Sequence, residues 1–167
     1  MPSWISSSTI STSSLPVRGF LLAWLIGWSL LPAPVIGADD VQVRTGDMLE
    51  IDEITYCLRG IEAPEPGQTC QRANGSSFDC GHIAKTALMD LTAGAKLECD
   101  PGKITERCTI AACRADGFDL SRNMVHTGWA RSLEKRFEQV ETLAKRRKQG
   151  LWSGRFEPPG NWRTARP

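Results

Sequence analysis

Residues 54–65 read ITYCLRGIEAPE and carry the clearest strand signal in the chain. Apolar and β-branched side chains prevail up to Ile61, and an acidic pair just before the run marks a tight turn. Pro64 ends the extended run, because two further turn-forming residues follow it closely. The stretch therefore predicts one strand of a sheet and the start of the loop after it.

Weaker patterns on either side predict the other elements. The predicted strands cover residues 41–43, 47–51, 54–61, 96–99 and 109–114, and the predicted helices cover residues 83–91, 119–125 and 133–149. Glycines follow these helices and are typical helix terminators. The order of three strands, a helix, two strands and two helices predicts a mainly β fold with α. We expect a closed, five-stranded OB-fold barrel with about three helices, the first of which closes one end.

The chain divides into a leader, one domain and a tail. Residues 1–38 contain one positively charged residue, a short apolar run over residues 19–31 and then a stretch of small residues before a possible cleavage site. This order is typical of a cleaved signal peptide. That run is shorter than the roughly 20 residues that span a bilayer, which disfavours the alternative of a retained anchor. We expect a periplasmic or secreted domain over residues 39–154, with no membrane span in the mature chain, and a Pro-rich tail over residues 155–167.

The charge balance bears on the possible partners. The chain has 20 Lys and Arg against 19 Asp and Glu, and Arg18 is the one charged residue of the leader. The rest of the chain is therefore neutral. Because non-specific nucleic-acid binding depends mainly on neutralising phosphates, a neutral domain binds nucleic acid only through a local site.

All six cysteines follow the leader: Cys57, Cys70, Cys80, Cys99, Cys108 and Cys113. An even number of cysteines in an exported chain indicates disulfides. A zinc site is the alternative, but no Cys-x-x-Cys pair is present and the chain has only two histidines. We expect Cys70–Cys80 to close the loop after residue 65, and Cys99–Cys113 to join two successive strands.

Two stretches of the chain resemble the staphylococcal nuclease-like (thermonuclease) family. Residues 45–47 (TGD) and 56–65 (YCLRGIEAPE) are similar to the family patterns Asp-Gly-Asp-Thr and Arg-Leu-x-Gly-Ile-Asp-Ala-Pro-Glu, and residues 150–152 match Gly-Leu-Trp. The resemblance covers nearly all of the chain after the leader and implies the same OB fold. It also implies calcium-dependent hydrolysis of DNA or RNA, in which a glutamate activates water and two arginines stabilise the charge on phosphate.

The resemblance assigns roles to three acidic residues. Glu65 matches the glutamate that acts as general base, and Asp47 and Glu62 match acids beside the calcium ion. Calcium accepts flexible shells of oxygen ligands at about 2.3–2.6 Å, so these two carboxylates could still hold it. Thr45 and Met48 depart from the family pattern at neighbouring positions.

The positions that match the two family arginines hold Cys57 and Cys108, the second by register alone. Because the arginines of the family converge on one phosphate, the resemblance implies that these cysteines face a common space and bond to each other. Arg59 is a candidate phosphate contact on the same strand face as Cys57, but about 6.6 Å further along the strand.

The resemblance therefore implies an exported thermonuclease-like protein with nuclease activity lost or strongly reduced. It would retain a binding role at the old cleft, with DNA, RNA or a protein partner. One alternative is an active calcium-dependent nuclease, with Glu65 as base and Arg59 or a tail arginine on phosphate. Another is a non-catalytic structural or assembly module of the periplasm.

Overall fold

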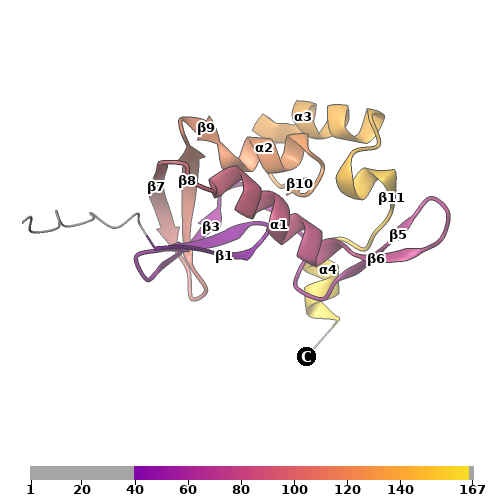
Figure 1. Cartoon of the computed structure of the whole chain (residues 1–167), viewed down its shortest axis with the longest axis horizontal. Helices are drawn as coiled ribbons and strands as arrows, with labels where there is room; N and C mark the ends of the chain where they lie inside the picture. Colours follow the sequence, from indigo (N-terminus) through magenta and orange to yellow (C-terminus); the bar gives the residue numbers. More distant parts are fainter. Residues whose placement is uncertain (1–39, 166–167) are drawn as a thin grey trace, which may run out of the picture. The chain divides into compact units, whose positions relative to one another are not determined.

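The computed structural model describes residues 40–165. The signal peptide expected over residues 1–38 lies outside this range. Within the described residues, the fold is mixed α/β, with mostly sheet and four α-helices (Figure 1). None of the helices described has the length and apolarity needed to cross a membrane.

The main sheet has the strand order β1-β2-β3-β8-β7, and β9 pairs with β8. Its strands are β1 (Val41–Thr45), β2 (Met48–Ile51), β3 (Ile54–Leu58), β7 (Leu97–Ile104), β8 (Thr109–Ala115) and β9 (Phe118–Asp119). The first three strands are antiparallel neighbours, and β3 then pairs in parallel with β8, with Cys57 opposite Ile110. Parallel neighbours require a long crossover, and the chain between these two strands supplies it.

The main sheet is open. No backbone pairing joins β1 to β7 in the described part of the chain, so the closed barrel expected from the sequence is not found. A hollow lined by β1 and by residues 92–96, which lead into β7, lies at this edge. The expected strands are present. Closing the sheet would also require backbone pairing between its two edge strands, and side-chain patterns do not specify that pairing.

Helices cover the sheet and enclose the core. They are α1 (Cys80–Thr92), α2 (Leu120–His126) and α3 (Lys135–Arg146), followed by the 3-10 helix η1 (Gly150–Ser153). The Asp79 side chain accepts a 2.8 Å hydrogen bond from the His82 N–H and so caps the start of α1. Leu49, Leu88 and Met124, from a strand and two helices, are wholly buried together.

The strand expected over residues 54–61 is interrupted. It ends at Leu58, and a separate short strand β4 (Ile61–Glu62) pairs with β10 (Arg131–Ser132). Gly60 has a φ of +77° at the break, a left-handed conformation that a strand does not contain. Beyond the break the chain pairs with β10 instead of β8.

Two further elements differ from the sequence prediction. The loop after Pro64 contains a hairpin of β5 (Thr69–Arg72) and β6 (Ser77–Asp79), to which β11 (Gly154–Arg155) pairs. Figure 1 shows this hairpin projecting away from the main sheet. The tail forms a fourth helix, α4 (Pro159–Thr164), whereas about three helices were expected.

Three disulfides connect the described residues: Cys57–Cys108, Cys70–Cys80 and Cys99–Cys113. Their Cα atoms lie 5.7, 5.7 and 4.0 Å apart, and no cysteine in this part of the chain is free. These are the pairs expected from the sequence. Three disulfides fit an oxidising, extracellular environment.

Candidate active-site cleft

A cleft of about 560 Å³ opens beside β2, β3 and β4. Its apolar lining consists of Met48, Leu58, Ile61, Ile110, Leu133 and the cysteines 57 and 108. Its charged lining consists of Asp47, Glu62, Glu106, Arg107 and Arg163. The break in the strand at Gly60 positions this cleft, because it separates the β3 wall from the β4 wall.

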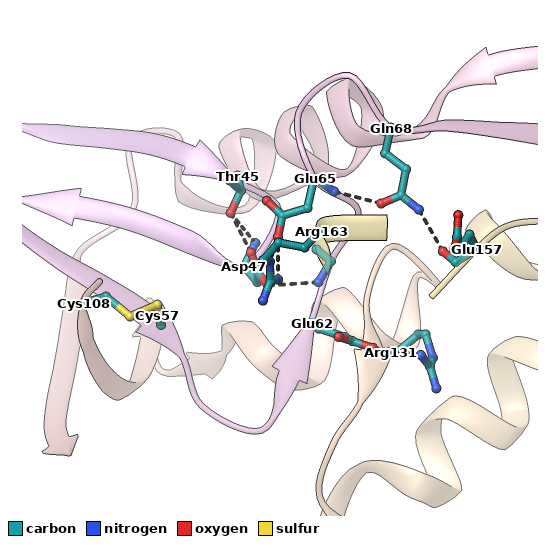
Figure 2. Close-up of polar contacts among 11 residues, drawn as sticks. Thr45, Asp47, Cys57, Glu62, Glu65, Gln68, Cys108, Arg131, Glu157 and Arg163 are labelled. Atoms are coloured by element: carbon teal, nitrogen blue, oxygen red, sulfur yellow. Dashed lines mark hydrogen bonds and ion pairs between the residues drawn. A yellow bond between two sulfur atoms is a disulfide. The ribbon is translucent and has the colours of Figure 1, made fainter. Parts of the chain in front are cut away.

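Asp47 lies in the turn between β1 and β2. The Thr45 hydroxyl donates a 2.5 Å hydrogen bond to Asp47 Oδ1, and the Ala63 N–H donates a 3.0 Å bond to Oδ2 (Figure 2). Burial raises the pKa of Asp47, while these hydrogen bonds oppose the rise. The turn packs tightly against Ala63 and Ala84, since a Cβ added to Gly46 would come within 2.8 Å of both residues.

Glu62 lies on β4 and lines the cleft. Arg131, from the paired strand β10, donates a 2.8 Å hydrogen bond to Glu62 Oε1 (Figure 2). The two residues are direct neighbours in the β4–β10 register, so the backbone pairing brings their side chains together. The Glu62 charge is thus already paired inside the protein.

Glu65 is paired with a residue of the tail. Arg163 of α4 donates a 2.6 Å hydrogen bond from Nε to Glu65 Oε1, and its terminal nitrogen contacts the same oxygen (Figure 2). Gln68 supports the loop from behind, because its Oε1 accepts a 3.1 Å bond from the Glu65 N–H. Its Nε2 donates a 2.8 Å bond to the carbonyl oxygen of Glu157.

The disulfide Cys57–Cys108 forms part of the cleft wall (Figure 2). Cys57 is on β3, and Cys108 directly precedes β8, which runs parallel to it. The Thr105 hydroxyl holds the second cysteine through a 3.2 Å bond from the Cys108 N–H. At these two positions the cleft wall is therefore a neutral covalent link.

The structure brings most of the predicted site residues together. Asp47 and Glu62 line the cleft with the disulfide, and Glu65 contacts the lining residue Arg163. Arg59 does not line it: its guanidinium lies against Gly102 of β7, 2.6 Å from where a Cβ would be.

Three polar residues of the site were not identified from the sequence: Gln68, Arg131 and Arg163. Their partners are 89, 69 and 98 residues away along the chain, so no local spacing connects them. The sequence suggested a tail arginine, without indicating which one.

The carboxylates are not arranged as a calcium shell. Both oxygens of Asp47 accept hydrogen bonds, and Glu62 is paired with an arginine. Among the described residues, no group of three or more His, Cys, Asp or Glu side chains is placed to hold a metal ion. A calcium ion would have to displace Arg131 or rearrange the Asp47 contacts, and each change costs an existing charge-assisted bond.

Comparison with known proteins adds no family assignment. No protein-family model matches the chain, and no curated protein matches it.

Proposed function

We propose that the chain is an exported thermonuclease-like protein of the OB type whose phosphodiester hydrolysis is lost or strongly reduced. In this proposal, residues 1–38 are its signal peptide and its cleft retains a binding role. The observation that carries the proposal is the disulfide Cys57–Cys108 in the wall of an acidic cleft. Further support comes from the strand order, since an OB fold is a partly open, five-stranded Greek-key barrel.

The loss of activity follows from the charge that phosphoryl transfer needs. The transition state places negative charge on the phosphate oxygens, and preorganised cations stabilise it. A single arginine contributes on the order of 10³–10⁵ in rate in related chemistry. The sulfurs of Cys57–Cys108 carry no charge and no strong donor, so the disulfide itself gives a phosphate no stabilisation.

The pairing of Glu65 weakens its proposed role as general base. A base must come within hydrogen-bond reach of the attacking water. Arg163 contacts Glu65 Oε1 through two of its nitrogens, so a water at that oxygen must compete with an ion pair. In the resting site Arg163 is therefore engaged with Glu65 and obstructs one of the two oxygens of the proposed base.

A nuclease assay on the purified mature protein tests the proposal. We expect cleavage of DNA and RNA in millimolar calcium to be orders of magnitude slower than for an arginine-bearing family member. Glu65→Gln and an assay in EDTA serve as controls for contaminating nucleases. A comparable rate that both controls abolish would overturn the proposal.

One observation favours a second candidate, an active calcium-dependent nuclease. Arg163 lines the same cleft as Asp47 and could move from Glu65 onto a phosphate as its cation. In that case Arg163→Gln would abolish calcium-dependent cleavage, and Arg163→Lys would retain part of it. If the protein is inactive, as we propose, neither substitution changes the background rate.

A further inference from the structure

The residues Glu157 to Thr164, which we call the arm, contact the loop that carries Glu65. Arg163, near the end of the arm, pairs with Glu65, while its own side chain is 42% exposed. A Cβ on Gly160 would lie 3.3 Å from a carboxylate oxygen of Glu62, so the arm also passes close to the second acid. The described chain thus places its own guanidinium group at the acidic edge of the cleft (Figure 2).

The side chain of Gln68 binds the backbone of the arm. The Gln68 side chain is fully buried, and its two polar ends bond to the Glu65 N–H and to the Glu157 carbonyl. Every polypeptide carries such carbonyl groups, so this contact recognises an extended chain of any sequence. A backbone carbonyl and a basic side chain are therefore the two groups that this edge of the molecule binds.

The lining of the cleft matches the same chemistry. Asp47, Glu62 and Glu106 face Arg107 and Arg163, and one of those arginines belongs to the arm itself. Without the arm, the lining has three acids, of which Glu62 is paired with Arg131, and one cation, Arg107, while Glu65 is unpaired beside them. A phosphodiester backbone would meet repulsion there, whereas a basic side chain would meet complementary charge.

Apolar surface surrounds these charges. Met48, Ile110 and Leu133 contribute to the walls, and Leu133 remains 62% exposed. Binding sites of this kind combine an apolar lining with a few polar groups that fix orientation. A ligand that carries apolar groups next to its cation therefore fits the cleft better than a simple ammonium or guanidinium ion.

We propose that the cleft docks a basic segment of a partner polypeptide, with an arginine between apolar residues that takes the place of Arg163 on Glu65. The inference rests on the proposed function, because both treat the cleft as a binding site. In the free protein the arm occupies the site as an intramolecular competitor. The apparent affinity for a partner is therefore the intrinsic affinity multiplied by the fraction of molecules in which the site is open.

The test uses the full mature chain, its Arg163→Gln variant and three probes. The probes are the acetylated, amidated tripeptide LRL, the same tripeptide with neutral citrulline in place of arginine, and a single-stranded DNA oligonucleotide. Binding is followed by NMR titration in EDTA. We expect Arg163→Gln to bind LRL about tenfold more tightly than the unsubstituted protein, because the competing guanidinium no longer occupies Glu65.

The controls separate charge recognition from altered folding. The citrulline tripeptide should show no such gain, and adding Glu65→Gln to Arg163→Gln should remove it. Arg163→Lys, which keeps the cation, should leave LRL binding close to that of the unsubstituted protein. Thermal unfolding of each variant verifies that the fold is intact.

The other outcomes overturn the inference. Equal binding of LRL and its citrulline counterpart, or no gain in Arg163→Gln, would show that Glu65 is not a docking site for a cation. A gain for the oligonucleotide alone would make nucleic acid the ligand, and dimerisation of Arg163→Gln would make a second copy the occupant. These titrations contain no calcium and measure no cleavage, so a positive nuclease assay would refute the proposed function without altering their reading.

Discussion

Asp47 lies where a carboxyl group holds its proton more readily than it does in water. Its folded-state pKa is raised above the usual 3.8, mainly by burial, and the Glu65 charge adds to the rise. Between the unfolded and the folded pKa, the native state binds more protons than the unfolded chain. Stability therefore falls as pH rises through this window, and the full penalty of ionising Asp47 is present at higher pH.

Asp47→Asn tests this penalty. Asparagine can still accept the bond from the Ala63 N–H and can donate to the Thr45 hydroxyl, but it does not ionise. We expect the melting temperature of Asp47→Asn, relative to the unsubstituted protein, to rise as pH increases from 4 to 7. Asp47→Ala should instead lose about 1–3 kcal/mol, because it leaves the Ala63 N–H without a partner. Equal losses for both variants at neutral pH would show that an ionised Asp47 stabilises the fold.

Whether a site residue could be identified from the sequence depended on how far along the chain its partner lies. Glu62 and Glu65 were identified because both belong to one contiguous motif. Gln68 lies just three residues beyond Glu65, yet its role depends on the Glu157 carbonyl, 89 residues away. A motif can reveal a carboxylate, but it cannot reveal which distant cation neutralises it.

The start of α1 fixes the position of the Glu65 loop. Gly81, in the first turn, lies so close to that loop that an added Cβ would be 1.9 Å from the Glu65 carbonyl oxygen. The Gly81 N–H also donates a 3.2 Å bond to the Gln68 carbonyl. Because the contact involves backbone on both sides, no side-chain rotation can relieve it. A glycine is therefore required where the helix meets the acidic loop.

Gly81→Ala should accordingly destabilise the protein by about 3 kcal/mol and displace the Glu65 loop together with the arm. Gly94→Ala is the control, because Gly94 has a φ of +68° but no atom within 4 Å of an added Cβ. Its cost of about 1–2 kcal/mol should arise from backbone strain alone. In hydrogen exchange, Gly81→Ala should lose amide protection in α4 and Gly94→Ala should keep it. Unchanged protection in both variants would contradict the coupling of α1 to the arm.

Elements with an apolar pattern were predictable, and elements held by other means were not. The strands β1, β2 and β8 and the helices α1, α2 and α3 lie within a few residues of the predicted ranges, because each has an apolar face against the core. In contrast, β3 ends at Leu58, before its predicted end, and β7 continues to Ile104 through mostly exposed residues. The β5–β6 hairpin has mostly exposed, polar side chains and is held by the Cys70–Cys80 disulfide and by pairing with β11. In α4, Pro159 suits the first turn of a helix, but two prolines and a glycine obscured the pattern.

Across the whole chain, the three disulfides constrain the unfolded state unequally. The Cys57–Cys108 link spans 51 residues, whereas Cys70–Cys80 spans 10. Chain entropy assigns more stabilisation to the longer loop: about 4 kcal/mol against about 3 kcal/mol. Of these two disulfides, the one in the cleft wall is therefore expected to stabilise the fold more.

Urea unfolding of two double variants tests this ranking. We expect Cys57→Ala with Cys108→Ala to lower the free energy of unfolding by about 4 kcal/mol, and Cys70→Ala with Cys80→Ala by about 3 kcal/mol. The m-value should rise in both, because the unfolded chain becomes more expanded. The opposite ranking would indicate that local packing around the hairpin outweighs the loop-length effect.

The pattern of cross-links also determines which proteolytic cuts the molecule can survive. Cys99 lies inside the loop closed by Cys57–Cys108, and its partner Cys113 lies outside it. A single cut anywhere between Cys57 and Cys113 therefore leaves the two fragments covalently joined. A cut after Cys113 leaves the C-terminal fragment, with Arg163, held by noncovalent contacts alone. One nick in that region can thus detach the guanidinium group that covers Glu65, whereas the main sheet would keep its covalent cross-links.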